Sequence, residues 1–267
     1  MIELVHLGGA PGRPLLVLGP SLGTSAETLW GPAAERLAAH FEVLAWDLPG
    51  HGRSPAPEPG AAVTMPTLAA GVRTALDRTD GGARTFHYAG DSVGGAVGLQ
   101  LLLDAPERVR TATLLCTGAS IGTPGSWHER IDTVRHGGTS ALVEASAQRW
   151  FGPGFLDREP AVGAALLDAL AAADDIGYAA VCGALATFDV RHRLGEITTP
   201  VLAVAGAHDV ATPPDSLAGI ASGVRHGDLE VLPGVAHLAP AEAPARVAEL
   251  VRTHAGRHDR EVTVPSS

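Results

Sequence analysis

Cysteine is nearly missing from this sequence, since only Cys116 and Cys182 carry a thiol among 267 residues. Two cysteines cannot form the dense disulfide framework of small secreted domains, so the composition favours a reducing, cytoplasmic location. Both lie among apolar residues, and we expect them to pack as small core side chains. The first residues, "MIELVHLGGAPGRP", also lack the basic start and long apolar run of a secretory signal peptide.

Long apolar runs and basic clusters are missing too. No segment approaches the roughly 18 apolar residues that a membrane-spanning helix requires. No run of Lys or Arg offers a stripe for phosphate groups. The formal net charge of −10 and the pI of about 5.6 give a surface that repels nucleic acid and anionic membranes. We therefore expect neither a nucleic-acid partner nor a membrane partner.

The motifs of metal and cofactor sites are likewise absent. The histidines show no H-E-x-x-H pattern and no Cys/His ligand spacing, and neither G-x-G-x-x-G nor G-x-x-x-x-G-K-[ST] occurs. We expect no metal and no cofactor. His51 in "DLPGHGRS" has no partner motif beside it, so we expect a structural role there.

The sequence is rich in short apolar runs that alternate with helical patterns. The runs have the length of buried strands, and strands that alternate with helices indicate a mostly parallel sheet covered on both faces. The expected strands are 14–20, 41–50, 85–92, 109–118, 200–209 and 228–237. The main expected helices between and after them are 30–41, 65–79, 94–106 and 243–255.

One long stretch breaks this alternation. Residues 122–196 contain helical patterns and no convincing strand. An all-helical insertion between two core strands predicts a cap over the carboxyl edge of the sheet, where open α/β sheets bind ligands. The predicted organisation is therefore a core of residues 1–121 and 197–260, a helical cap of residues 122–196, and a flexible tail of residues 261–267.

"GDSVG" at residues 90–94 matches the pattern G-x-S-x-G. It stands between an expected strand and an expected helix, which is the context of a nucleophile elbow. In such a turn the Ser92 hydroxyl is exposed, and side chains at Gly90 and Gly94 would collide with neighbouring backbone. We predict that Ser92 is a nucleophile.

The partners of such a serine follow in the order Ser…Asp/Glu…His. Asp209 comes at the carboxyl end of one expected strand, in "VLAVAGAHDVATPP", and His237 follows another, in "EVLPGVAHLAPAEAP". In this arrangement Asp209 orients His237, and His237 removes the proton of Ser92. The plain alternatives are a helix-capping role for Asp209 and a backbone-bonded turn role for His237.

Acyl transfer also needs hydrogen-bond donors for the oxyanion. One donor is expected to be the backbone N–H of Val93, directly after the nucleophile. The other is expected from the loop "SLGTS", where Leu22 is the candidate because Gly23 permits the turn.

With these motifs the sequence resembles the α/β-hydrolase superfamily over essentially the whole chain. The resemblance rests on "GPSLGTSAETLW", "DLPGHGRS", "AGDSVGGAVGLQLLLDAPERV", "GAHDVATPP" and "GVAHLAPAEAP". More narrowly it is similar to the 3-oxoadipate enol-lactonases, through "IGTPGSWHERIDTVR", "RWFGPGF" and "GYAAVCGAL". This resemblance implies a cofactor-independent serine hydrolase that opens the enol-lactone to 3-oxoadipate through an acyl-enzyme, in the β-ketoadipate pathway of aromatic catabolism.

The sequence departs from that family at two places. The oxyanion loop reads Gly19-Pro20-Ser21 where Ser-Asn-Ser is frequent, and Asp91 and Val93 flank the serine where Leu and Met are common. The first departure leaves the details of the donor network open.

The substrate that the resemblance implies carries a carboxylate, which requires a local cation in so acidic a protein. Arg130 follows Trp127 by three residues, so both share one helix face. We predict that Arg130 binds the carboxylate and that Trp127 and Trp150 line the apolar part of the pocket. The alternative is that Arg130 makes a surface ion pair and the tryptophans pack the cap.

Other functions fit the same motifs. They are a carboxylesterase or lactonase of different specificity, a cofactor-free perhydrolase, and a receptor that binds a ligand without turnover. We expect a small carboxylated lactone or ester as the substrate and a monomer or small homo-oligomer.

Overall fold

The computed structural model describes residues 2–58, 60–82 and 84–261 of the chain. Within these residues a sheet of seven strands forms the centre, in the order β1-β3-β2-β4-β5-β6-β7. The strands are β1 (Leu4–Gly8), β2 (Leu15–Gly19), β3 (Glu42–Trp46), β4 (Phe86–Asp91), β5 (Val109–Leu115), β6 (Val201–Gly206) and β7 (Gly227–Leu232).

The sheet is parallel except at one edge, where β1 pairs antiparallel with β3. All six expected strands form, and β1 is an addition to them. Its sequence, "LVHLG", gives little hydrophobic signal because Val5 alone among its residues is fully buried. The expected runs also extend past the true strands at their carboxyl ends. The run 228–237, for example, leaves the sheet after Leu232, and its remaining residues form a loop.

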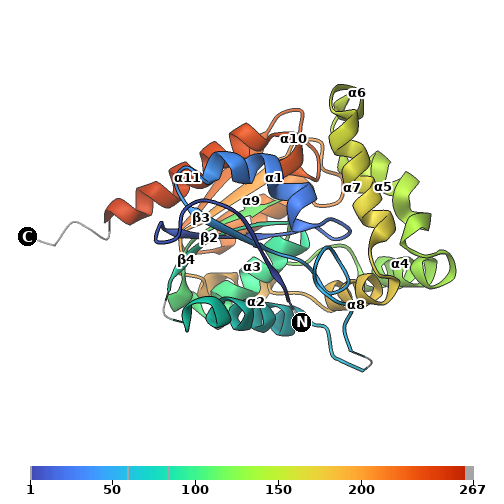
Figure 1. Ribbon diagram of the computed structural model, residues 1–267, viewed down its shortest axis with the longest axis horizontal. Helices are drawn as coiled ribbons and strands as arrows, with labels where there is room; N and C mark the ends of the chain where they lie inside the picture. The colour runs from blue at the N-terminus through green and yellow to red at the C-terminus, as the bar shows by residue number, and fades with distance from the viewer. Residues whose placement is uncertain (1, 59, 83, 262–267) are drawn as a thin grey trace, which may run out of the picture.

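Helices cover both faces of the sheet, with α1 and α11 on one side and α2 and α3 on the other (Figure 1). This is the predicted fold class. The α-helices are α1 (Ala26–Leu37), α2 (Met65–Asp80), α3 (Val93–Asp104), α4 (Pro124–Gly137), α5 (Val143–Trp150), α6 (Phe155–Arg158), α7 (Pro160–Ala172), α8 (Asp175–Ala186), α9 (Pro214–Gly223), α10 (Ala239–Glu242) and α11 (Pro244–Glu261). Three short 3₁₀ helices are η1 (Pro106–Arg108), η2 (Thr139–Leu142) and η3 (Arg191–Glu196).

Side-chain caps fix the starts of several helices, and α3 is an informative exception. Ser25, Thr64 and Thr123 each accept a hydrogen bond from the backbone N–H three residues on, at the starts of α1, α2 and α4. The N-cap residue of α3 is Ser92, and its hydroxyl makes no such bond. The hydroxyl of Ser92 is therefore available to another partner.

The helices α4–α8 follow β5 and precede β6, and Figure 1 shows them gathered at one end of the molecule. Between residues 122 and 196 the described structure contains no strand, and the nearest pairing is an isolated bridge of Ser120 with Asp189. We call residues 122–196 the helical insert; their status as a separate cap domain stays a prediction. Of the predicted tail, Glu261 ends α11 and residues 262–267 lie outside the described residues.

Both cysteines are buried and unpaired, as expected. Among the described residues, a single helix that is long and apolar enough to cross a membrane does not occur. The helices α7 and α8 reach that length and composition only as a pair, with a bend of 95° between them.

Candidate active site

Ser92 occupies a sharp turn between β4 and α3. Its φ of 52° and ψ of −117° are rare for a residue with a side chain, and its backbone N–H donates to the carbonyl of Leu115 on the neighbouring strand. The strand β4 ends at Asp91, one residue before the end of the expected run 85–92, and α3 begins at Val93, one residue before the expected helix 94–106. The turn thus projects Ser92 from the carboxyl end of β4.

Glycine is required on both sides of this serine because the chain passes close to itself. A Cβ on Gly90 would lie 2.4 Å from the carbonyl oxygen of Gly94, and one on Gly94 would lie 2.5 Å from the carbonyl carbon of Gly19. A Cβ on Gly95 would lie 2.6 Å from the side chain of Thr117. The sequence signature around Ser92 is therefore a requirement of close backbone packing.

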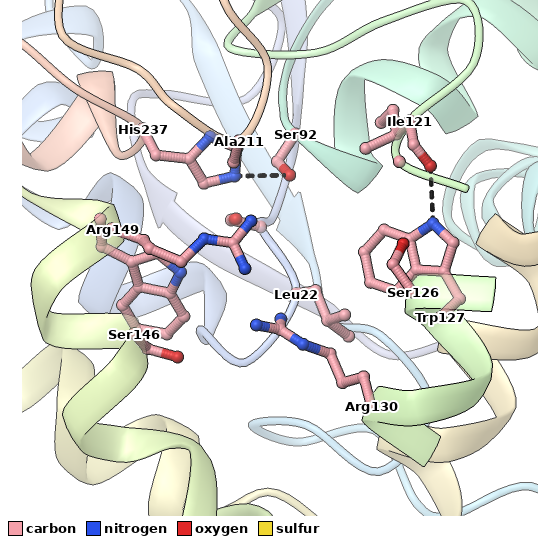
Figure 2. Close-up of a pocket in the computed structure, with 13 residues that line it drawn as sticks. Leu22, Ser92, Ile121, Ser126, Trp127, Arg130, Ser146, Arg149, Ala211 and His237 are labelled. Atoms are coloured by element: carbon pink, nitrogen blue, oxygen red, sulfur yellow. Dashed lines mark hydrogen bonds between the residues drawn. The ribbon is translucent and has the colours of Figure 1, made fainter. Parts of the chain in front are cut away.

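The structure brings Ser92, His237 and Asp209 together in one chain of hydrogen bonds. The Nε2 atom of His237 lies 2.9 Å from the Ser92 Oγ (Figure 2), and its Nδ1 lies 2.9 Å from the Asp209 Oδ2. A carboxylate can only accept, so Nδ1 carries the proton and Nε2 is left to accept from the Ser92 hydroxyl. All three residues are buried at 7% exposure or less, so these hydrogen bonds are largely shielded from water.

Four donors hold the Asp209 carboxylate. Besides the His237 Nδ1–H, they are the backbone N–H groups of Ala211 and Thr212 at 2.8 and 3.0 Å, and the Thr212 hydroxyl at 2.7 Å. Burial by itself raises the pKa of Asp209, but His237 and the Thr212 donors more than offset it, so the pKa lies below its usual value. The carboxylate therefore stays ionised beside the imidazole.

Thr212 was not predicted from the sequence, although its place three residues after Asp209 is typical of a turn that caps a carboxylate. We expect Thr212→Val to lower kcat/KM for ester hydrolysis about tenfold, because a hydrogen bond to a charged group contributes about 1.5–3 kcal/mol. Steady-state kinetics beside Thr133→Val, which removes an exposed hydroxyl on α4, measures the effect. Equal activity in the two variants would show that the Thr212 hydroxyl does not position Asp209.

The two predicted oxyanion donors are both available. Among the described residues, the backbone N–H groups of Leu22 and Val93 have no hydrogen-bond acceptor. Leu22 lines the cavity beside Ser92, and Gly23 after it has a φ of 86°, as the tight turn requires. The Val93 side chain is fully buried, so its backbone alone can serve the site.

A small cavity of about 110 Å³ opens at Ser92 and His237. Its walls come from two sources, the loops at the carboxyl ends of the strands and the helices α4 and α5 of the helical insert (Figure 2). The core supplies Ser21, Leu22, Ser92, Ile121, Ala211 and His237, and the insert supplies Gly122, Ser126, Trp127, Arg130, Ser146, Arg149 and Trp150. The insert thus forms part of the pocket wall, as expected of a cap.

All three predicted substrate-binding residues line this cavity. Trp127 is half-buried and donates from its indole N–H to the carbonyl of Ile121 at 2.6 Å, while Trp150 is 5% exposed. The Arg130 guanidinium lies 5.9 Å from the centre of the Trp127 ring and donates to the Tyr178 hydroxyl at 3.1 Å. In the described part of the chain it pairs with no carboxylate, and its role in binding a substrate stays a prediction.

Two further polar residues of the wall were missed in the sequence. Arg149 on α5 has no carboxylate within ion-pair distance among the described residues, and Figure 2 shows it and Arg130 pointing into the cavity. Burial lowers the pKa of Arg149, and the nearby Arg130 charge acts in the same direction. The buried Ser146 hydroxyl, one turn before Arg149, also has no partner within the described structure. The signal was the spacing of Ser146, Arg149 and Trp150 on one short helix.

Asp91, the unusual neighbour of Ser92, is completely buried and both its carboxyl oxygens lack a partner among the described residues. Burial raises the pKa of Asp91 well above its usual value, and the charges of Asp209 and Glu242 act in the same direction. Burial beside Ser92 thus favours the protonated form of the Asp91 carboxyl. Within the described residues, no group of three or more His, Cys, Asp or Glu side chains is arranged to hold a metal ion.

Sequence comparison agrees with this geometry. Residues 14–155 match the family model of the alpha/beta hydrolase fold. A 3-oxoadipate enol-lactonase of Acinetobacter baylyi is 34% identical over 236 residues, which cover 88% of this chain and 86% of that protein. A putative carbamate hydrolase, RutD, of Variovorax paradoxus is also 34% identical, over 87% of both chains.

Comparison with solved structures also finds an enol-lactonase. The crystal structure of the enol-lactonase from Burkholderia xenovorans superimposes with a TM-score of 0.88 at 31% sequence identity, and the match covers 95% of each chain. Both the arrangement of the sheet and that of the helical insert are therefore shared with a solved enol-lactonase.

Proposed function

Since the chain belongs to the alpha/beta hydrolase fold family, we propose that it is a serine hydrolase whose substrate is a small carboxylated lactone, 3-oxoadipate enol-lactone. One observation carries the choice of substrate. Arg130 and Arg149 enter the cavity at Ser92, and neither has a carboxylate partner in the described structure. A substrate carboxylate would supply the missing counter-charge, and arginine binds carboxylate through two parallel hydrogen bonds.

The chemistry follows from the hydrogen-bond chain. The Ser92 Oγ attacks the lactone carbonyl carbon while His237 Nε2 takes the hydroxyl proton, and Asp209 stabilises the resulting imidazolium. The oxyanion is placed against the N–H groups of Leu22 and Val93, at the positive N-terminus of α3. This arrangement stabilises the charge that develops on the carbonyl oxygen.

Collapse of the tetrahedral intermediate breaks the ring C–O bond and gives an acyl-enzyme on Ser92. The leaving enolate stays attached to the acyl chain, takes the proton from His237 and becomes the ketone. A water molecule then attacks the ester carbonyl, with His237 as its base, and releases 3-oxoadipate and free Ser92. The net reaction adds one water to one lactone and needs no cofactor. In this proposal the protein acts in aromatic catabolism through 3-oxoadipate.

The relatives described as putative carbamate hydrolases make carbamate cleavage the second candidate. The Ser92, His237 and Asp209 arrangement serves either acyl group, but a neutral carbamate leaves the Arg130 and Arg149 guanidinium groups that line the cavity without a counter-charge. The hydrogen bond that the Ser92 hydroxyl donates to His237 Nε2 favours turnover over a receptor that only binds its ligand.

Steady-state hydrolysis of four substrates tests the proposal. They are 3-oxoadipate enol-lactone, a neutral lactone of the same ring size, a p-nitrophenyl ester and a small carbamate. We expect the largest kcat/KM for the enol-lactone, roughly 10- to 100-fold above the neutral lactone, as charge-assisted hydrogen bonds suggest. A preference for the carbamate or for neutral substrates would overturn the assignment of substrate while leaving the hydrolase in place.

Arg130→Met is expected to raise KM for the carboxylated lactone about 10- to 100-fold with little change for the p-nitrophenyl ester, because only the lactone has a charge to lose. Arg149→Met should act in the same way if both side chains meet the carboxylate. Arg135→Met is the matched control, since Arg135 is 69% exposed on the same helix as Arg130. Equal losses on both substrates would mark Arg130 as a packing residue of the insert.

A further inference from the structure

Glu242 belongs to neither the hydrogen-bond chain at Ser92 nor the lining of the cavity, yet its carboxylate joins two parts of the site. The Oε1 atom accepts from the backbone N–H of Ala236 at 2.9 Å, directly before His237. The Oε2 atom accepts from the backbone N–H of Gly152 at 2.6 Å, two residues after Trp150. One half-buried carboxylate thus ties the His237 loop to the segment after α5.

A second contact joins the same two segments. The backbone N–H of His237 donates to the carbonyl of Trp150 at 3.1 Å. The approach at Gly152 is so close that a Cβ there would lie 2.3 Å from the carbonyl oxygen of Gly234 and 3.0 Å from the Glu242 Oε2. The end of α5 and the His237 loop are therefore in direct backbone contact on both sides of the carboxylate.

These two segments carry different parts of the proposed activity. The loop carries His237, which must stay 2.9 Å from the Ser92 Oγ. The helix α5 carries Ser146, Arg149 and Trp150, which form one wall of the cavity. A shift between the two segments would move the base relative to the bound substrate.

From these contacts we propose that Glu242 is a positioning residue, which locks the His237 loop to the end of α5 so that the base and the pocket wall keep a fixed geometry. The proposal rests on the proposed function, because it concerns the same Ser92 site. Glu242 acts through backbone N–H groups, chiefly those of Ala236 and Gly152, and accepts no hydrogen bond from a reacting atom.

The charge of Glu242 suits this task. Burial raises the pKa of Glu242, while the N–H groups of Gly152 and Ala236 act in the opposite direction by stabilising the ionised form. Hydrogen bonds to a carboxylate are shorter and stronger than those to a neutral acceptor. An amide in place of the carboxylate keeps one acceptor oxygen and presents an N–H₂ group to the other backbone N–H, so one of the two bonds is lost.

The test compares Glu242→Gln and Glu242→Ala with Glu249→Ala, which removes an exposed carboxylate on the neighbouring helix α11. Turnover of the lactone and of a p-nitrophenyl ester is normalised to sites titrated with a fluorophosphonate, so unfolded protein does not count. We expect Glu242→Ala to lower kcat about 10- to 100-fold and to raise the lactone KM, because misplacement of about 1 Å costs as much as 100-fold. Glu242→Gln should fall between wild type and Glu242→Ala, and Glu249→Ala should match wild type.

Gly152→Ala disturbs the same contact from the other side. If the contact acts as a unit, the double variant Gly152→Ala/Glu242→Ala should lose no more activity than the worse single variant. Additive losses would contradict the proposal, as would wild-type kcat per titrated site in both Glu242 variants. A wild-type protein that neither hydrolyses esters nor reacts with the fluorophosphonate would instead refute the proposed function, and the role of Glu242 with it. If Glu242→Ala does not fold, the nearly isosteric Glu242→Gln decides the question.

Discussion

Replacing Ser92 with alanine is expected to lower kcat about 10⁶-fold, which is the typical loss when such a catalytic unit loses its nucleophile. The hydroxyl contributes its hydrogen bond to His237 and little packing, since it faces the cavity at the start of α3. The melting temperature should therefore change little. Residual catalysis would come from the Leu22 and Val93 N–H groups and from substrate binding alone.

Kinetics, thermal unfolding and fluorophosphonate labelling together measure this effect. Ser222→Ala is the matched control, because its hydroxyl bonds only to the carbonyls of its own exposed helix turn. The control should keep wild-type activity and labelling, and Ser92→Ala should lose both. Activity above a tenth of wild type in Ser92→Ala would exclude Ser92 as the nucleophile.

Asp209→Asn is expected to lower kcat about 10⁴-fold at neutral pH, the magnitude found when the acid of such a triad becomes an amide. The reason is the tautomer of His237. An amide N–H₂ beside Nδ1 donates to it, which moves the ring proton to Nε2 and removes the acceptor for the Ser92 hydroxyl. The Asn carbonyl oxygen can still accept from the N–H groups of Ala211 and Thr212, so the turn should persist.

The measurement is kcat per folded protein, with Asp132→Asn as the control because Asp132 is an exposed residue of α4. A fall of less than tenfold in Asp209→Asn would show that His237 is oriented by another group, and Thr212 is the first to test, at 3.4 Å from Nδ1. A comparable fall in Asp132→Asn would show that the loss in Asp209→Asn does not come from its contact with His237.

Local sequence patterns predict much of the fold and of the candidate site. The glycines around Ser92 are readable because each prevents a clash close to the turn, and the turn itself fixes where the serine points. The alternation of apolar runs and helical patterns predicts the parallel sheet because strands buried on both faces are mostly apolar. Asp209 and His237 are readable because parallel strands end at one edge of the sheet, so the loops after them converge.

The strand β1 was not predicted from the sequence, because an edge strand buries few of its side chains and therefore has a weak apolar pattern. Four residues of the site were not predicted from the sequence for another reason: Arg149, Ser146, Thr212 and Glu242. Their roles depend on which side of α5 faces the cavity and on how close the His237 loop comes to Gly152.

Sequence alone therefore determined the six parallel strands β2 to β7, their order along the chain, and the candidate residues Ser92, Asp209 and His237, since neighbouring residues and the direction of the strands decide these. The tertiary structure alone decided the second cation of the pocket, Arg149, and the link through Glu242. The side of α5 that faces the cavity and the contact of the His237 loop with Gly152 depend on the packing of segments that are distant in the chain. Gly152 and Glu242, for example, are 90 residues apart. No local pattern encodes that packing.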